Sequence, residues 1–404
     1  MACSYLLDEE IMEEFIKHNS TFLAKTLMGL EDVLAEELRS IGATDVISVK
    51  RGVVFSGGKD ILYKANYCCR TAIRILTNIH EFNAHNEQTL YDGVKQFDWS
   101  GILGTENTLA VTGTVFSDHF NHSHYVALKT KDAIVDQFRD KTGVRPNVDT
   151  ENPDVVLNVH IVKDHVTISL DSSGTSLHIR GYKKEAKEAP LNEVLAAGMI
   201  KLSGWEPGQP LIDFMCGSGT ILSEAALIAE NVAPGFFRPK FGFETWGNYE
   251  PELFDKIKGE AKEKESPGIK GFIGGCDHSP GAVKVALQNL KEAGLKDINI
   301  EISDFKKYDH NFESGVVIIN PPYGERLAVL DIESLYKEIG DTWKHQYKGF
   351  KCWMITSSKE GIKSIGLKPF KKYDMMNGAL ECKYLGFDIY AGSKKAKYNE
   401  NANA

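Results

Sequence analysis

The sequence predicts an α/β protein in which two small α/β units precede a larger, mostly parallel sheet. Three observations lead to this fold class. Apolar strands and amphipathic helices alternate from Pro190 onward, which is typical of a parallel sheet with helices on both faces. Asn377-Gly378 joins two apolar runs near the end, the strongest short signal for an antiparallel hairpin. A length of 404 residues favours two or three domains.

The first segment, residues 20–82, has the element order β-α-β-β-α-β of a ferredoxin-like unit. Apolar periodicity predicts strands at 21–26, 46–50, 53–56 and 73–79, and helices at 30–41 and 60–71. Such a small sheet indicates a fold and leaves the function open.

A second small α/β segment is interleaved with the first and extends over residues 60–170. Strands are expected at 108–116, 155–162 and 166–170, and helices at 89–97 and 125–141. Residues 171–189 contain a charged stretch, and we expect them to form a linker.

The third segment, residues 190–393, carries the parallel sheet. Strands are expected at 211–216, 271–276, 298–302, 315–319, 351–356, 370–375 and 380–390, and helices at 191–202, 218–230, 280–293, 334–345 and 359–365. A parallel sheet finished by an antiparallel hairpin is the ordering of the class I (Rossmann-like) methyltransferase fold. The polar tail, 394–404, is expected to be disordered.

The composition is that of a soluble globular protein, with 42% hydrophobic and 25% charged residues. No stretch approaches the roughly 18 consecutive apolar residues of a membrane-spanning helix, and the acidic N-terminus is no signal peptide. The seven cysteines are scattered without a Cys-x-x-Cys pair. This argues against structural zinc and disulfides and favours a cytoplasmic location.

One histidine cluster, formed by His119, His122 and His124, suggests a metal site. No cysteine or paired acid lies near it in the sequence, so a polar loop is the better interpretation. We therefore expect no metal site.

The net charge of −9 is unusual for a protein that binds nucleic acid. Residues 344–398, however, hold 12 basic and 4 acidic residues, a local net charge of +8 (12 − 4). A local basic surface can bind phosphate whatever the total charge is. A solvated lysine face explains the same run equally well.

A glycine-rich turn between the first strand and helix of the third segment is the sharpest motif. Gly217 and Gly219 allow a tight turn that brings backbone N–H groups close to a ligand. The turn lacks the third glycine of a dinucleotide-binding motif and the Gly-Lys-Ser/Thr of an NTPase loop. Alone it could be a mere tight turn. As a cofactor site it would comprise Asp213, Met215, Cys216, Gly217, Ser218, Gly219 and Thr220.

Two further acids follow the next two strands. Asp277, followed by His278, ends the second strand, where a carboxylate can accept both ribose hydroxyl protons. Asp304, between Ser303 and Phe305, follows the third, where it or its neighbours can bond an adenine amino group. Each acid alone is more often a turn residue or helix cap. Because ligands of open α/β sheets bind beyond the carboxyl ends of the strands, the three signals together predict a nucleotide-cofactor site.

The fourth strand is followed by Asn320-Pro321-Pro322-Tyr323. This motif suits the methylation of an exocyclic amine such as guanine N2. Such an amine is a poor nucleophile, because its lone pair is delocalised into the ring. It attacks a sulfonium methyl better when the Asn320 side-chain oxygen and the Pro321 carbonyl accept its hydrogens. The prolines hold the loop rigidly extended, and Tyr323 can stack on an extruded base. Asn320 also borders the cofactor site. For the isolated motif, a rigid turn with a core tyrosine is the alternative.

These motifs together resemble the bacterial THUMP-domain guanine-N2 RNA methyltransferases. The matching segments are 213–220 with the Ser-Glu-Ala-Ala-Leu-Ile-Ala that follows, the insertion motif 241–246, and 320–327. The resemblance covers nearly the whole chain, including a ferredoxin-like start and a THUMP-like segment.

The resemblance implies S-adenosylmethionine as the cofactor, an RNA-binding THUMP segment, and methyl transfer to guanine N2 in structured RNA. Ribosomal 23S RNA is the first expectation for the substrate and transfer RNA the second. Asn320, Pro321, Pro322 and Tyr323 would hold the target base. Arg180 and Asn192 would contribute near the mouth of the cofactor site.

Two other classes of function stay open. Asn-Pro-Pro-Tyr also occurs in adenine-N6 and cytosine-N4 DNA methyltransferases and in glutamine methyltransferases. A non-catalytic RNA-binding assembly factor is the third candidate. The sequence does not indicate an oligomeric state.

Overall fold

The structure, a computed structural model, describes residues 21–183, 191–266, 268–269, 271–322 and 332–390. The chain divides into two compact units, each made of segments that are distant in sequence. Unit 1 comprises Met1–Thr26, Leu34–Ile179 and Arg238–Glu260. Unit 2 comprises Leu27–Val33, Arg180–Phe237 and Ala261–Ala404. In the described parts of the chain, no helix combines the length and apolarity needed to cross a bilayer.

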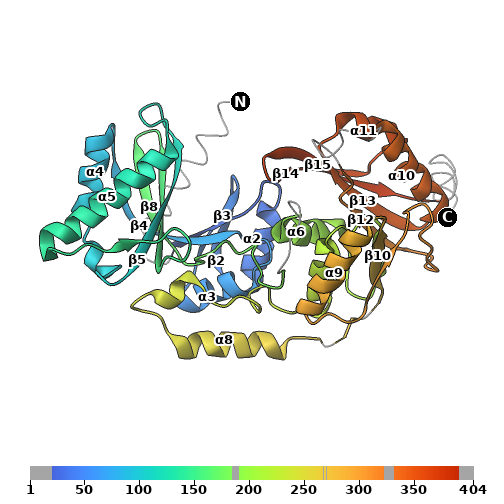
Figure 1. Cartoon of the computed structure of the whole chain (residues 1–404), viewed down its shortest axis with the longest axis horizontal. Helices are drawn as coiled ribbons and strands as arrows, with labels where there is room; N and C mark the ends of the chain where they lie inside the picture. The colour runs from blue at the N-terminus through green and yellow to red at the C-terminus, as the bar shows by residue number, and fades with distance from the viewer. Residues whose placement is uncertain (1–20, 184–190, 267, 270, 323–331, 391–404) are drawn as a thin grey trace. The chain divides into compact units, whose positions relative to one another are not determined.

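Unit 1 is built on one eight-stranded sheet with the order β2-β3-β1-β4-β8-β7-β5-β6 (Figure 1). Its strands are β1 (Thr21–Lys25), β2 (Thr44–Val49), β3 (Gly52–Ser56), β4 (Arg74–Asn83), β5 (Thr108–Phe116), β6 (Asn147–Val148), β7 (Val155–Val162) and β8 (His165–Asp171). The ten-residue β4 pairs with β1 through its first half and with β8 along most of its length. The two small α/β segments expected from the sequence therefore share a continuous sheet.

Helices cover this sheet and complete its core. The helical elements placed wholly or mainly in unit 1 are α2 (Glu31–Ser40), α3 (Lys59–Cys68), α4 (Glu87–Gln96), η1 (Trp99–Gly101), α5 (Ser123–Thr142), η2 (Gly242–Thr245) and α8 (Pro251–Glu263). Ile134 and Phe138, four residues apart on α5, lie in one buried cluster with Trp99 and Val159. The helix α5 ends at Gly143, whose φ of +75° is the left-handed conformation of a helix C-cap.

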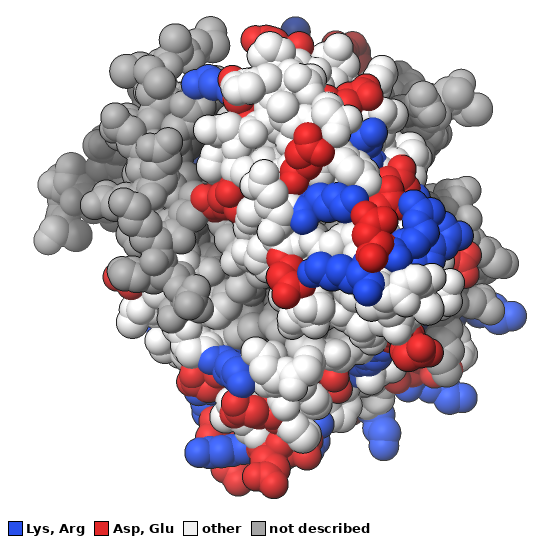
Figure 2. Space-filling view, turned by 90° about the vertical axis from the view of Figure 1, so that its left-hand side faces the viewer, with Lys and Arg blue, Asp and Glu red and all other residues white. Residues whose placement is uncertain are grey.

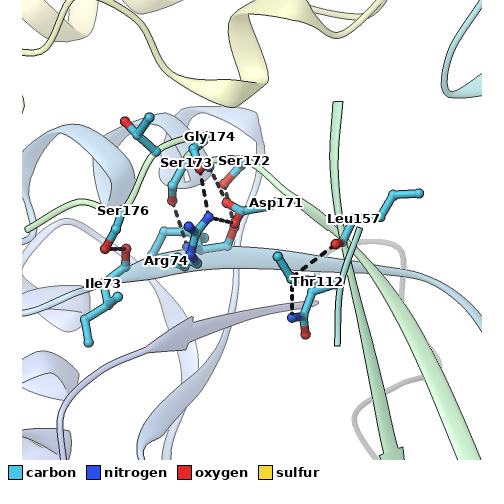
Figure 3. A network of polar contacts seen from close by, with 12 residues as sticks. Ile73, Arg74, Thr112, Leu157, Asp171, Ser172, Ser173, Gly174 and Ser176 are labelled. Carbon is cyan, nitrogen blue, oxygen red and sulfur yellow. Dashed lines mark hydrogen bonds and ion pairs between the residues drawn. The ribbon is translucent and has the colours of Figure 1, made fainter. Parts of the chain in front are cut away.

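A buried polar network holds the chain where it leaves β8 (Figure 3). Arg74 of β4 forms an ion pair with Asp171 and donates to the carbonyl of Gly174 at 2.8 Å. The backbone N–H of Ser173 donates to Asp171 Oδ1 at 2.8 Å, and the Ser173 hydroxyl accepts from the N–H of Ile75 at 2.9 Å. The residues directly after β8 are therefore packed against β4, although we expected a linker to begin here.

The insertion between α7 and β10 of unit 2 contributes to unit 1. Arg238 donates to the carbonyls of Ser173, Thr175, Ser176 and Ile179 at 2.7–3.2 Å. The ring of Phe243 stacks on that of Tyr63 with centroids 4.3 Å apart. Residues 238–260, expected within the third segment, thus pack on α3 and on the chain after β8.

Unit 2 is built on a seven-stranded sheet with the order β11-β10-β9-β12-β13-β15-β14. Its strands are β9 (Leu211–Asp213), β10 (Ile273–Asp277), β11 (Ile298–Ile302), β12 (Gly315–Ile319), β13 (Phe350–Thr356), β14 (Lys371–Asn377) and β15 (Leu380–Asp388). The strands from β11 to β13 are parallel, and β14 and β15 form the antiparallel hairpin around Gly378. This arrangement confirms the predicted fold class.

The helices of unit 2 are α6 (Glu193–Ser203), α7 (Thr220–Ala229), α9 (Pro280–Glu292), α10 (Ile332–Gln346) and α11 (Lys359–Ser364). The core cluster on one side of the sheet includes Ile212, Val317, Trp343 and Phe350. The strand β9 ends at Asp213, earlier than the expected 216. The reason is that the Asp213 side chain accepts the N–H of Met215 at 3.1 Å, which turns the chain out of the sheet.

Candidate cofactor and base-binding site

The carboxyl ends of four neighbouring strands meet at one edge of the unit 2 sheet. In the sheet, β10 lies on one side of β9 and β12 on the other, with all three parallel. This arrangement makes β9 the switch point beyond which open α/β sheets bind their ligands. Asp213 and Asp277 end β9 and β10, and Asn320 directly follows β12. The structure therefore brings to one edge the residues that the sequence placed after separate strands.

The glycine turn after β9 has the backbone conformation that its sequence suggests. Gly217 has φ +54° and Gly219 has φ +79°, both in the left-handed region where glycine is favoured. Gly219 is also the N-cap of α7. A Cβ atom on Gly275 of β10 would lie 1.8 Å from the carbonyl oxygen of Asp213, so this third glycine permits close packing of the two strands. The role of Gly275 cannot be predicted from the sequence, because only the pairing of β10 with β9 places it against Asp213.

Asp277 connects the glycine turn to β10. Its Oδ2 accepts the backbone N–H of Gly217 at 2.9 Å, and its Oδ1 accepts that of Ser279 at 2.9 Å. A carboxylate offers about four lone-pair sites, so each oxygen can accept one further hydrogen bond. His278 is largely exposed, with Nδ1 3.6 Å from Asp277 Oδ1. The geometry of Asp277 suits a ligand with two neighbouring hydroxyls, such as a ribose.

Asp213 lies beneath the turn and is 1% exposed. Burial raises the pKa of its carboxyl to about 8, the bond from Met215 opposes this, and the charge of Asp277 adds to it. The side chain thus shapes the turn by accepting the N–H of Met215, which is itself half-buried.

The other residues of the turn have structural partners. Cys216 is buried, and burial raises the pKa of its thiol, which is the opposite of what a nucleophile requires. The carbonyl of Ser218 accepts from Asn289 Nδ2 of α9 at 3.1 Å. The hydroxyls of Ser218 and of Thr220, the buried first residue of α7, lie 3.4 Å apart.

The segment after β11 lies beside Asp277. The N–H of Ser303 donates to the carbonyl of Asp277 at 3.2 Å. Asp304 accepts the N–H of Lys306 at 2.9 Å and is partly exposed. The ring of Phe305 stacks on Phe214 with centroids 5.4 Å apart. The three residues expected to face an adenine are thus anchored to β10 and to the core.

Asn320 provides an unsatisfied acceptor at this edge. Its Oδ1 is buried and has no hydrogen-bond partner among the residues that the structure describes. Pro321 is buried and Pro322 half-buried, while Tyr323 lies outside the described residues. Leaving a buried acceptor unsatisfied costs about 1–3 kcal/mol, so such a group requires an explanation. A donor on a bound ligand, such as an amino group, would satisfy it.

Two residues that the resemblance placed near the cofactor mouth have structural contacts. Arg180 and Glu224 of α7 are both buried, with Nε and Oε1 3.4 Å apart, and Tyr182 donates to the same oxygen at 3.1 Å. Asn192 caps α6, with Oδ1 accepting the N–H of Val194 at 2.9 Å. Arg180 and Glu224 therefore tie the entry of unit 2 to the helix that follows the glycine turn.

Family models match three consecutive parts of the chain. Residues 21–76 match the RlmL ferredoxin-like domain, residues 84–171 the THUMP domain, and residues 180–385 the RMKL-like methyltransferase domain. These matches confirm the family expected from the sequence motifs.

Two relatives match almost the whole chain. A Synechocystis protein with the provisional name RNA methyltransferase slr0064 is 36% identical over 371 residues, which are 91% of this chain and 97% of that protein. The ribosomal RNA large subunit methyltransferase K/L of Syntrophotalea carbinolica is 39% identical over 381 residues, again 91% of this chain. These residues are 53% of that relative, so the chain spans about half its length.

A solved structure shares the fold over both units. The crystal structure of SMU.472, described as a methyltransferase complexed with SAH, is 30% identical and has a TM-score of 0.81, covering 93% of this chain and 99% of that one. The bound product-like ligand agrees with the cofactor predicted from the strand-end motifs. The chain belongs to the RMKL-like family of S-adenosylmethionine-dependent methyltransferases.

Proposed function

We propose that the protein methylates N2 of a guanine in structured RNA, with 23S ribosomal RNA as the first candidate substrate and transfer RNA as the second. The observation that carries the proposal is the buried, unsatisfied Oδ1 of Asn320 beside the strand ends that would hold the cofactor. The name of the Syntrophotalea relative supports a ribosomal substrate.

The residues at the sheet edge suit the cofactor. Among the described residues, no neighbouring atom lies within 4 Å of where a Cβ on Gly217 would stand, so a ligand can approach the turn closely there. Asp277 retains acceptor capacity for ribose hydroxyls. Asp304 and its neighbours would bind the adenine. When bound, S-adenosylmethionine supplies a methyl group on a positively charged sulfur.

The Asn-Pro-Pro loop would orient the amino group. Asn320 Oδ1 and the Pro321 carbonyl would each accept one N–H, which concentrates electron density on the nitrogen and aims its lone pair. Transfer would form a nitrogen–carbon bond as the carbon–sulfur bond breaks, and the nitrogen would then release a proton to water. Tyr323 would stack on the base.

The THUMP segment would bind the RNA, and its surface indicates how. On the face shown in Figure 2, basic and acidic side chains are interspersed and do not form a field of one sign. Lys95 pairs with Asp140 at 2.6 Å, and Lys141 with Asp98 at 2.9 Å. Recognition at this face would depend on shape and hydrogen bonding to the RNA more than on a basic patch.

The test is methyl transfer from labelled S-adenosylmethionine to separate pools of unmodified ribosomal RNA, transfer RNA and DNA, followed by nucleoside digestion. Labelled 2-methylguanosine from ribosomal RNA is the expected result. The same nucleoside from transfer RNA alone would support methylation of guanine N2 but identify transfer RNA as the substrate. Labelled 6-methyladenosine, or RNA binding without any transfer, would overturn the proposal.

A further inference from the structure

Three loops of unit 1 bring two histidines and an aspartate together at one edge of its sheet. His85 follows β4, His119 follows β5, and Asp164 lies in the turn between β7 and β8. His85 Nδ1 lies 3.2 Å from Asp164 Oδ2, and His119 Nε2 lies 3.4 Å from Asp164 Oδ1. All three ligand atoms lie within 4.8 Å of one another.

We propose that His85, His119 and Asp164 form a binding site for a divalent transition-metal ion of the zinc class. Two imidazoles and one carboxylate are a ligand set that zinc uses, with water completing a tetrahedron. With bonds of about 2.0–2.2 Å, ligand atoms of a tetrahedral zinc site lie about 3.3–3.5 Å apart. The two contacts to the Asp164 carboxylate, at 3.2 Å and 3.4 Å, are close to this spacing, and both imidazoles are exposed enough to turn toward each other.

The strand register explains why these residues meet. Asn83 is paired with His165, Val162 with His165, and Phe116 with Val162. The strands β4, β5 and β7 therefore end, and β8 begins, in one row, so the three ligands lie at the same edge of the sheet.

The backbone that carries each ligand is fixed by hydrogen bonds. The N–H of Ala84 donates to the carbonyl of Asp164 at 2.8 Å, and that of Lys163 donates to the carbonyl of Phe116 at 2.8 Å. The N–H of His85 donates to Thr89 Oγ1, which belongs to the capping box of α4. A site with ligands anchored before binding loses little conformational entropy when the ion enters.

No metal site was expected here from the sequence, because no cysteine or paired acid lies near His119, His122 and His124. The acid instead comes from a turn 45 residues after His119 (164 − 119), and the second imidazole is His85. The alternative is that protonated imidazoles simply form ion pairs with Asp164. An ion bound at this place would cross-link three loops of the THUMP segment and stabilise unit 1. The inference is independent of the proposed methyl acceptor.

The test is titration of the full, tag-free, chelator-treated chain with Co²⁺, whose visible absorption reports the coordination geometry, followed by displacement with Zn²⁺. We expect one Co²⁺ per chain, tetrahedral absorption, and a higher melting temperature with Zn²⁺. His85→Ala, His119→Ala and Asp164→Asn should each weaken binding at least about tenfold, since even an outer-shell partner contributes that much. His122→Ala and His124→Ala are the matched controls and should bind as the unmodified chain does.

Circular dichroism establishes that each variant is folded, so a loss of binding reports the site. Absence of stoichiometric Co²⁺ binding by the folded chain would overturn the proposal. Equal binding by the three ligand variants, or equal loss in the two controls, would also overturn it.

Discussion

The backbone N–H of Gly217 donates a 2.9 Å hydrogen bond to Oδ2 of Asp277, joining the turn after β9 to the end of β10. One carboxylate thus fixes the glycine turn and can still accept further hydrogen bonds. A ligand bound by Asp277, as proposed, would therefore be coupled to the conformation of this loop.

Replacing Asp277 by Asn should weaken cofactor binding. The amide keeps one acceptor oxygen but loses the second, so one bond to the ribose or to Gly217 is lost, at a cost of about 1–3 kcal/mol. Calorimetry with S-adenosylhomocysteine would measure an increase in Kd of roughly 5- to 150-fold. Asp297→Asn, which removes an exposed charge from the same unit, is the control. Unchanged affinity in Asp277→Asn would remove Asp277 from the site.

Asn320→Ala should abolish most of the transfer without affecting cofactor affinity. Loss of one positioned hydrogen-bonding group of this kind lowers kcat by about 10²–10³-fold. Because Oδ1 makes no hydrogen bond within the described residues, its removal should not lower the melting temperature. Asn299→Ala, an exposed position on β11, is the control. A stability loss as large as the activity loss would indicate a structural role.

Asp213→Asn should stabilise the chain at neutral and alkaline pH. The pKa of the Asp213 carboxyl is about 8 in the folded chain and about 4 when unfolded. This group therefore does not change the free energy of unfolding below about pH 4. Between about pH 4 and pH 8 the free energy of unfolding decreases as pH rises, and it is lowest above about pH 8. Relative to the Asn variant, the free energy of unfolding of the unmodified chain should fall by about 1.4 kcal/mol per pH unit in this range. Denaturant unfolding of both chains at pH 5, 6 and 7 measures how the free energy of unfolding depends on pH. The same pH dependence in the unmodified chain and in Asp213→Asn would contradict the expectation.

Glu224→Leu should be strongly destabilising, because it removes the carboxylate beside the buried Arg180 guanidinium. Breaking a buried ion pair by deleting one partner costs about 3–5 kcal/mol. The double variant Arg180→Met/Glu224→Leu should recover much of this stability, since no buried charge then remains. Urea unfolding of the single and double variants measures the coupling. Additive losses would show that the two side chains act independently.

Charge reversal of Lys371 and Lys372 should weaken RNA binding if the basic C-terminal run contacts phosphate. Each lost phosphate contact should reduce the slope of log affinity against log salt by about one. The structure also offers another role, because β14 is an edge strand and exposed lysines there discourage pairing with other chains. Unchanged RNA binding after charge reversal, together with increased aggregation when both lysines are replaced by uncharged residues, would favour the edge role.

Local periodicity was sufficient to predict most elements and the position of the candidate site. The strands β5, β11 and β12 begin and end where the sequence indicates, because short apolar runs and turn residues bound them. The strand ends then locate the site, since parallel strands have their carboxyl ends at one edge.

Contacts between distant segments could not be predicted in this way. The helix α8 was missed, and Arg238 binds carbonyls about 60 residues earlier in the chain. The partner of Glu224 and the carboxylate beside His119 also come from other elements. None of these leaves a periodic signal, because pairing across the fold depends on tertiary packing.

The contribution of residues 238–260 to unit 1 has a consequence for synthesis. When the first 179 residues emerge from the ribosome, Arg238 and Phe243 have not yet been translated. The hydrogen bonds of Arg238 and the stacking of Phe243 on Tyr63 can therefore form only later. Unit 1 can reach its final packing only after the glycine turn of unit 2 has also been made. A nascent chain halted near residue 180 should therefore be more sensitive to protease than one halted after 260 residues have left the exit tunnel.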